Sequence, residues 1–191
     1  MAKTGLFFGS FNPIHTGHLI IASYMANFTD LEEVWLLVSP QNPLKNKKGL
    51  ANMYDRLEMA RLATEPSGRI KVSDIEFKLP QPSYTIDTLT YLHEKYPEKE
   101  FVLIMGADNL DSFKKWKNYE VLLKNYHLYV YPRYGFDLKE WKDHPSVTLT
   151  ETPQMEISST FIRKALKDNK NIQFVVPDKV IEFMDSKNMY R

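Results

Sequence analysis

The 191-residue chain contains no cysteine. Disulfide bonds, zinc–thiolate sites and a cysteine nucleophile are therefore excluded, and the composition is compatible with a reducing compartment. An excess of charge of one sign is also missing, because the formal net charge is +1 although 26% of the residues are charged. With so little net charge, no overall electrostatic field points to a nucleic-acid or membrane partner.

Long hydrophobic runs are absent as well. A membrane-spanning helix needs about 20 consecutive apolar residues, and every apolar run here is far shorter. The segment 1–4 leads straight into a strand-like run, without the basic start, apolar stretch and small-residue cleavage site of a signal peptide. We therefore expect a cytoplasmic protein with small-molecule partners.

Short apolar runs alternate with segments of helical periodicity along almost the whole chain. Strands are predicted over 6–9, 34–38, 70–72, 101–106, 127–131 and 147–149, and helices over 17–28, 53–64, 85–96, 116–123, 159–167 and 178–184. This alternation predicts a single α/β domain over residues 1–191, with a Rossmann-like, doubly wound, mostly parallel sheet and a helical C-terminus. Because ligands bind at the carboxyl ends of the strands in such sheets, we expect the functional residues directly after the strands.

The first group of such residues joins the 6–9 strand to the helix that follows it. The string Gly9-Ser10-Phe11-Asn12-Pro13-Ile14-His15-Thr16-Gly17-His18 places His15 and His18 three residues apart at a helix start, where both imidazoles can face the same way. A helix amino terminus adds unpaired N–H donors and a positive dipole end. Together these features indicate a phosphate site with two titratable donors. The alternatives are a zinc pair, for which no third ligand has suitable spacing, or two capping histidines.

A second group opens a helix late in the chain, at Ile157-Ser158-Ser159-Thr160-Phe161-Ile162-Arg163. Ser158 and Ser159 are good helix amino-terminal caps. Hydroxyls, backbone N–H groups and Arg163 could meet one polyphosphate there. Taken alone, the segment is equally compatible with an ordinary capped helix that carries a surface arginine.

Both groups resemble the signatures of the nucleotidylyltransferase superfamily: His-x-Gly-His after a Gly-Ser-Phe-Asn-Pro turn, and Ile-Ser-Ser-Thr-x-Ile-Arg. The resemblance extends from Gly5 to the last helix. It implies that His15 and His18 are catalytic and that the second segment holds the β- and γ-phosphates of ATP. The ATP-binding residues that it implies are Gly9, Ser10, Phe11, His15, His18, Gly106, Asp108, Ile157, Ser158, Thr160 and Arg163.

Three further segments resemble the nicotinate mononucleotide adenylyltransferase branch of that superfamily: 82–89, 105–110 and 115–116. The resemblance implies that the first contacts the pyridine carboxylate and that the indole of the third stacks on the pyridine ring. The implied residues for nicotinate mononucleotide are Lys45, Ser83, Tyr84, Thr85 and Trp116. On composition alone, Trp116 is equally a core residue, Lys45 a solvated lysine and Asp87 a helix-start residue. Arg56 is a further candidate for a phosphate contact.

The chain departs from the branch at two positions. Leu44 stands where the family often has histidine, which weakens the expected contribution of the loop around Lys45. Asn12 stands where the family often has aspartate, a minor change because an amide still binds a ribose or the backbone.

The resemblance implies the reaction of ATP with nicotinate mononucleotide in NAD biosynthesis, with release of pyrophosphate. The cofactor is Mg²⁺, which enters with ATP and is held by phosphates and water, so no protein metal site is expected. Phosphopantetheine adenylyltransferase is the nearest alternative activity. A non-catalytic nucleotide sensor on the same scaffold is an alternative of another class. A homo-oligomer is allowed but not required by the sequence.

Overall fold

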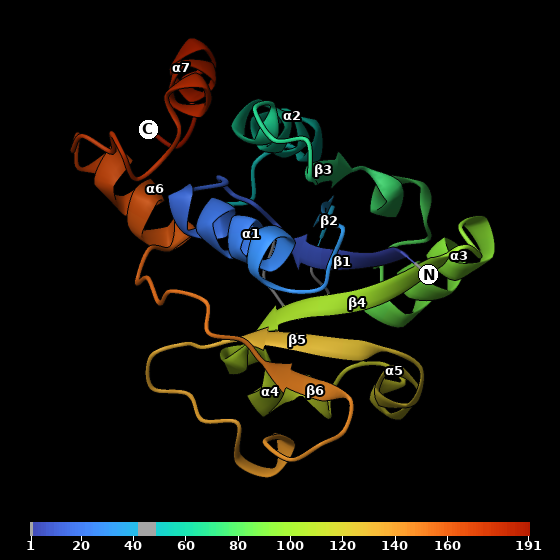
Figure 1. The fold of residues 1–191 in the computed structure, drawn as a ribbon. Helices are drawn as coiled ribbons and strands as arrows, with labels where there is room; N and C mark the ends of the chain where they lie inside the picture. Colours follow the sequence, from blue (N-terminus) through green and yellow to red (C-terminus); the bar gives the residue numbers. More distant parts are fainter. Residues whose placement is uncertain (1, 42–48) are drawn as a thin grey trace.

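Six parallel strands form the centre of the molecule (Figure 1). The computed structural model describes residues 2–41 and 49–191. The strand order is β3-β2-β1-β4-β5-β6, and every neighbouring pair is parallel. The predicted doubly wound sheet is therefore confirmed, and it is parallel throughout. The strands are β1 (Ala2–Gly9), β2 (Glu33–Val38), β3 (Ile70–Ser73), β4 (Lys99–Gly106), β5 (His127–Tyr131) and β6 (Val147–Leu149).

Helices cover both faces of the sheet, so its strands are apolar on both sides. Within β1, Leu6 faces one hydrophobic core and Phe7 the other, as the two-residue period of a strand requires. One core lies under α1 (Thr16–Phe28), α2 (Met53–Thr64), α6 (Ser159–Lys167) and α7 (Asp178–Ser186). The other lies under α3 (Thr85–Lys95), α4 (Ala107–Phe113) and α5 (Tyr119–Asn125). Two short 3₁₀ segments complete the described elements, η1 (Ile75–Lys78) and η2 (Lys139–Trp141).

Most predicted elements are observed within a residue or two of their expected ends, and three points differ. The strand predicted over 6–9 begins earlier, at Ala2. No helix was predicted at α4, which begins directly after β4 and spans only seven residues. The helix predicted over 116–123 begins later, at Tyr119. Asn118 takes a left-handed backbone conformation with φ of 53°, which interrupts a continuous helix before that point.

The strand order reverses between β1 and β4, where the first crossover leads to β2 and a later one returns the chain to the other side of β1. At such a switch point the connections leave the carboxyl edge in opposite directions and open a crevice between them. The carboxyl ends of β1 and β4 are Gly9 and Gly106. The segments that follow these two glycines are therefore placed side by side at the expected ligand-binding edge.

Arg56 on α2 ties the ends of β1 and β2 together. Its side chain is fully buried. The guanidinium donates to the carbonyl of Ser10 at 2.6 Å and to that of Ser39 at 2.7 Å. It also donates to Pro40 O at 2.9 Å and to Ala51 O at 3.0 Å. These donors are thus occupied by backbone, so the sequence-based suggestion that Arg56 contacts phosphate is not supported: the guanidinium holds the turns that line the edge of the sheet.

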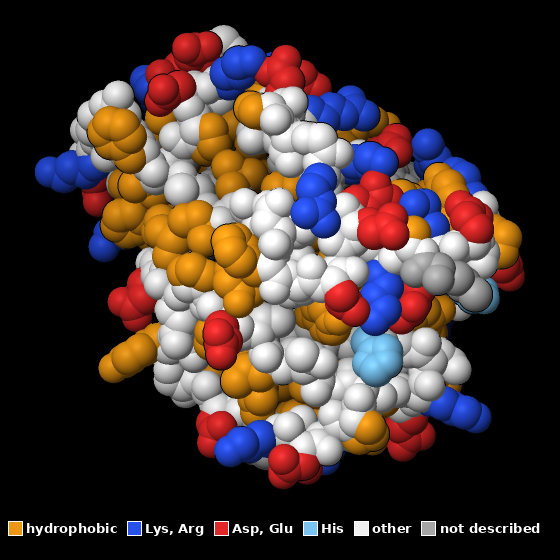
Figure 2. Space-filling view, in the orientation of Figure 1, with side chains coloured by type: hydrophobic (Ala, Val, Ile, Leu, Met, Phe, Trp, Pro, Cys, Tyr) orange, Lys and Arg blue, Asp and Glu red, His pale blue; other side chains and the backbone are white. Residues whose placement is uncertain are grey.

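The surface shows charges of both signs interspersed, with an apolar area on the side where α1 and α6 lie (Figure 2). Within 2–41 and 49–191, the structure contains no helix with the length and apolar character needed to cross a membrane.

Replacing Arg56 with Met should lower the free energy of unfolding by about 3 kcal/mol or more, because four buried or partly buried carbonyls lose their donor. Arg61→Met is the matched control on the same helix. Its exposed guanidinium forms only a 3.9 Å ion pair with Glu58, and the variant should change stability by less than about 0.5 kcal/mol. Urea unfolding of the two variants measures the difference. Equal changes in the free energy of unfolding for the two variants would contradict a stabilising role for the Arg56 hydrogen bonds.

Candidate functional site

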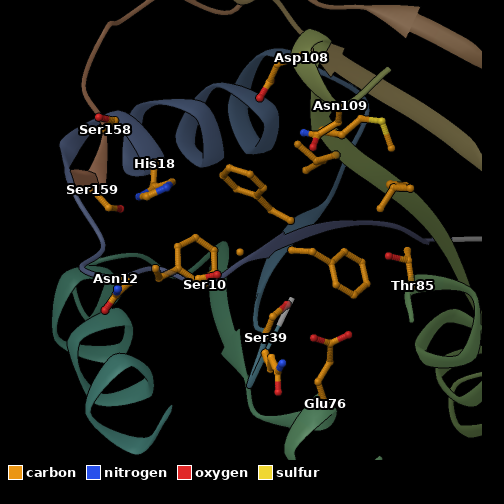
Figure 3. A pocket seen from close by; sticks show the side chains of 18 of the residues that line it. Ser10, Asn12, His18, Ser39, Glu76, Thr85, Asp108, Asn109, Ser158 and Ser159 are labelled. Carbon is orange, nitrogen blue, oxygen red and sulfur yellow. The ribbon is translucent and has the colours of Figure 1, made fainter. Parts of the chain in front are cut away.

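A cavity of about 450 Å³ opens at the carboxyl edge of the sheet (Figure 3). Residues that follow each of the six strands line it, which is the arrangement expected of a ligand site in a doubly wound sheet. In strand order along the chain, examples are Ser10, Ser39, Glu76, Asp108, Arg133 and Ile157. Figure 3 shows Asn12, His18, Ser158 and Ser159 at one end of the cavity, and Ser39, Glu76 and Thr85 at the other.

The turn after β1 shapes the first end of the cavity. Phe11 takes a left-handed conformation with φ of 45°, a strained state for a residue with a side chain. Its buried ring folds back under Gly9, where a β-carbon would lie only 2.7 Å from the ring. The same ring meets the His18 imidazole edge-on, with ring centres 5.1 Å apart. The glycine is therefore required by the aromatic ring that supports one of the two histidines.

His15 and His18 face the same way, as their spacing predicted. Their rings stack with centres 3.6 Å apart and an angle of 25° between the planes. His15 caps α1, and its backbone N–H donates to His18 Nδ1 at 3.3 Å. When the His18 ring is neutral, its proton therefore lies on Nε2. A β-carbon at Gly17 would come within 3.1 Å of the His15 ring, so glycine leaves the space that this stack needs.

His15 is held in its neutral form. The side chain is only 4% exposed, and its Nδ1 has no hydrogen-bond partner among the described residues. Burial, together with the positive charge of Arg133, lowers the pKa of His15 to about 4. A neutral imidazole can donate one hydrogen bond to a phosphate without carrying a charge of its own. Arg133 supplies positive charge nearby.

The second segment packs directly against the first turn. Ser158 caps α6 by accepting from the N–H of Phe161 at 3.2 Å. Ser159 Oγ donates to Pro13 O at 3.0 Å, and Arg163 donates to Asn12 O at 2.7 Å. The two segments are far apart in sequence, yet their polar groups share one wall of the cavity. Hydroxyls, an arginine and the amino ends of α1 and α6 converge there, which suits a polyphosphate.

The other end of the cavity carries the indole of Trp116 and the amino end of α3. Ser83, Tyr84 and Thr85 line it where α3 begins, and Trp116 lines it from the turn after α4. Trp116 is partly buried against Phe113, with ring centres 5.3 Å apart. Its indole is therefore both a packing group and a cavity wall. Asp87 lies in the first turn of α3 and pairs with Lys117 at 2.8 Å, which agrees with its reading as a helix-start residue.

Three ionisable groups of the cavity were missed by the sequence analysis: Glu76, Lys117 and Arg133. Glu76 is 2% exposed and accepts from the Thr88 hydroxyl at 2.9 Å, and burial raises the pKa of its carboxyl. Arg133 lies over the Tyr131 ring and 3.6 Å from the carboxylate of Asp108. Glu76 and Arg133 each follow a strand within a few residues, and this placement was the feature of the sequence that could have identified them.

The structure gathers most of the predicted site residues in one place. Gly106 is the exception among the described positions, because it does not line the cavity. A β-carbon there would lie 3.0 Å from the Tyr131 ring and collide with the Asp108 carboxylate, so the glycine leaves room for these two side chains. Lys45 lies outside the described residues. The predicted residues that line the cavity are Gly9, Ser10, Phe11, His15, His18, Ser83, Tyr84, Thr85, Asp108, Trp116, Ile157, Ser158, Thr160 and Arg163.

The chain is similar to known proteins along its whole length. The cytidylyltransferase-like family model matches residues 6–165. A probable nicotinate-nucleotide adenylyltransferase of Flavobacterium johnsoniae is 55% identical over 191 residues, covering 99% of each chain. A protein of the same name from Cytophaga hutchinsonii is 51% identical and covers 98% of each. Among solved structures, the nicotinic acid mononucleotide adenylyltransferase of Plasmodium falciparum, complexed with NaAD, superposes with a TM-score of 0.84 at 21% identity, covering 100% of this chain and 98% of that one.

Replacing Arg133 with Gln should raise the pKa of His15 above its value of about 4, because the variant removes a positive charge that disfavours the imidazolium. A titration of the imidazole resonances followed by NMR measures this directly. Arg61→Gln serves as the control, since Arg61 is an exposed residue of α2 that does not line the cavity, and should leave the titration unchanged. A His15 midpoint near 6.5 in the unaltered protein would contradict the proposed neutral state.

Proposed function

This chain belongs to the cytidylyltransferase-like family, and we infer that it transfers the adenylyl group of ATP to nicotinate mononucleotide, giving nicotinate adenine dinucleotide and pyrophosphate. It is thus a nicotinate-nucleotide adenylyltransferase, an enzyme of NAD biosynthesis. The curated relatives favour this acceptor over phosphopantetheine. We also propose that the protein is cytoplasmic.

One observation carries the proposal: a single cavity joins a phosphate-binding end to an aromatic end. The histidine pair and the 157–163 segment form the first end, and Ser83–Thr85 with Trp116 form the second. A dinucleotide product contains both kinds of group: a diphosphate and the flat rings of its two nucleosides. The nearly full-length similarity to relatives of that name adds independent support.

The ATP half of the proposal rests on donors that converge on phosphate. His15 and His18 stand at the amino end of α1, and Thr160 and Arg163 stand in the first turns of α6. Arg163 already donates to the Asn12 carbonyl and to Thr160 Oγ1 at 3.3 Å, so its guanidinium is fixed before any ligand arrives. We assign the histidines to the α-phosphate, and Thr160 and Arg163 to the β- and γ-phosphates. Lys45 remains a proposed phosphate contact.

The acceptor half rests on one flat surface and one set of N–H donors. The indole of Trp116 offers a face for a pyridine ring, and the amino end of α3 offers backbone N–H groups for a carboxylate. Lys115 also lines this end and adds positive charge, while the charge of Lys117 is paired with Asp87. A pyridine ring that bears a carboxylate therefore finds both stacking and charge complementarity.

The chemical step needs positioning more than proton transfer. A phosphate oxygen of nicotinate mononucleotide attacks the α-phosphorus of ATP in line, and the bond to the bridging oxygen of the β-phosphate breaks, so that pyrophosphate leaves. The second pKa of a phosphate monoester is about 6, so the attacking group is already ionised at neutral pH and no general base is required. His15 and His18 stabilise the charge that develops at the α-phosphate, and no covalent enzyme intermediate forms.

Mg²⁺ belongs to the proposal as a companion of ATP. Among residues 2–41 and 49–191, no group of three or more His, Asp or Glu side chains lies close enough to hold a metal ion, and the Asp108 carboxylate already faces Arg133. We assign the ion to the nucleotide phosphates and water, where it would neutralise part of the phosphate charge, because Mg²⁺ in such sites keeps several waters and binds substrate phosphates. The chain's own residues bind the phosphates rather than the ion.

Pyrophosphate release with Mg-ATP and one acceptor at a time tests the function. We expect turnover with nicotinate mononucleotide to exceed that with nicotinamide mononucleotide or phosphopantetheine. His18→Ala should lower kcat by about 10²- to 10³-fold, because a donor to the transition state is lost. His127→Ala, at the exposed start of β5, is the matched control and should keep normal turnover. Activity with phosphopantetheine alone would overturn the acceptor, and silence with all three would favour a sensor.

Removing the indole should affect the acceptor and spare ATP. Trp116→Ala should raise KM for nicotinate mononucleotide by about tenfold or more, because stacking on an aromatic side chain contributes about 1–3 kcal/mol per base. Trp116→Phe keeps a flat face and should recover part of the loss. Steady-state kinetics with each substrate varied in turn separates the two KM values. An equal rise in both would place Trp116 in the packing of the protein rather than in acceptor binding.

A further inference from the structure

The segment that follows α7 returns to the turn after β1. Tyr190 lies in this segment, with its half-buried ring packed against the core beneath α1 and α2. Its hydroxyl donates to Asn12 Oδ1 at 2.7 Å. Asn12 itself lines the cavity and is 6% exposed. A side chain at the far end of the sequence therefore touches the wall of the active site.

The Asn12 side chain bonds two further pieces of backbone, and the Asn12 carbonyl bonds one more side chain. Its Oδ1 also accepts from the N–H of Ala51 at 3.1 Å, and its Nδ2 donates to Gly49 O at 2.9 Å. Its own carbonyl accepts from Arg163 at 2.7 Å. The amide thus links the first turn to the segment that leads into α2. The same residue is joined to α6 through its backbone.

The tyrosine hydroxyl is suited to be a permanent donor. It lies near the guanidinium groups of Arg56 and Arg163, which favour ionisation, yet burial outweighs them and raises the pKa of Tyr190 well above its ordinary value. The hydroxyl therefore keeps its proton at working pH. An oxygen that receives both the Tyr190 hydroxyl and the Ala51 N–H must be the carbonyl oxygen of the amide, so the orientation of Asn12 is fixed.

Fixing this amide matters because the turn that carries it is strained. Phe11, the residue before Asn12, holds a left-handed conformation and supports the His18 ring. Such a conformation persists only where surrounding contacts determine it. A looser Asn12 would allow Phe11 to relax and the His18 imidazole to shift. Displacements of about 1 Å are enough to lower a rate that depends on positioning.

We propose that Tyr190 is a positioning residue of the active site, acting through Asn12 to hold the turn that places Phe11 and His18. It does not touch the substrates and is not a catalytic residue. The role rests on the proposed adenylyl transfer, but its geometric part can be measured without turnover.

Tyr190→Phe removes the hydroxyl and keeps the ring. We expect kcat to fall about fivefold, the equivalent of one hydrogen bond of about 1 kcal/mol, with KM for nicotinate mononucleotide and the melting temperature nearly unchanged. The imidazole NMR resonances of His18 should shift in the free protein. Tyr129→Phe is the matched control, because it removes a hydroxyl that bonds Asp30 away from the cavity, and both readouts should stay constant.

A double-mutant cycle tests the route through Asn12. In an Asn12→Ala background, Tyr190→Phe should have no further effect on kcat or on the His18 resonances, because its partner is already gone. In an Asn12→Asp background, which retains an accepting oxygen and guards against misfolding of the alanine variant, the tyrosine effect should persist. Full effects of Tyr190→Phe in the alanine background would overturn the proposal, as would unchanged kcat and unchanged His18 resonances in Tyr190→Phe alone. If no acceptor supports turnover, the proposed function fails, and the His18 resonances still decide the role of Tyr190.

Discussion

The structure depends on one constraint: the turn after β1 must hold its carbonyls away from the ligand while keeping a strained backbone. Two guanidinium groups provide the solution, that of Arg56 fully buried and that of Arg163 partly buried. Arg56 donates to Ser10 O, and Arg163 donates to Asn12 O. A buried cation is costly unless its N–H groups are satisfied, and here backbone carbonyls satisfy them in place of a carboxylate. The left-handed Phe11 is tolerated because its neighbours on both sides are fixed in this way.

The same arrangement sets the charge of the cavity. Arg133 and Arg163 line it, and His15 remains neutral beside them because burial and Arg133 both disfavour its charged form. Positive charge is therefore concentrated on groups that cannot lose their proton, while the histidine contributes a donor. Two acidic groups also line the cavity. The carboxylate of Asp108 lies 3.6 Å from Arg133, and burial raises the pKa of Glu76.

Local signals in the sequence were sufficient for most of the fold and for many of the residues that line the cavity. Apolar periodicity predicted α2 over 53–64 and β5 over 127–131, which agree with the structure. It could not reveal α4, which is too short to show a period, or the delayed start of α5, which depends on the backbone of Asn118. Nor could the sequence show that the space beside Gly106 is taken by the side chains of Asp108 and Tyr131.

The residues that sequence reasoning misjudged or missed share a physical cause. Arg56 binds main-chain carbonyls, which every residue possesses, so its partners leave no pattern in the sequence. Tyr190 acts on a single amide 178 positions away, and only the folded chain brings the two together. Residues that meet the ligand need a particular chemistry at a particular spacing, and this makes a motif. Residues that hold the motif in place need only reach it, so they can come from any element that packs nearby, and the structure is required to find them.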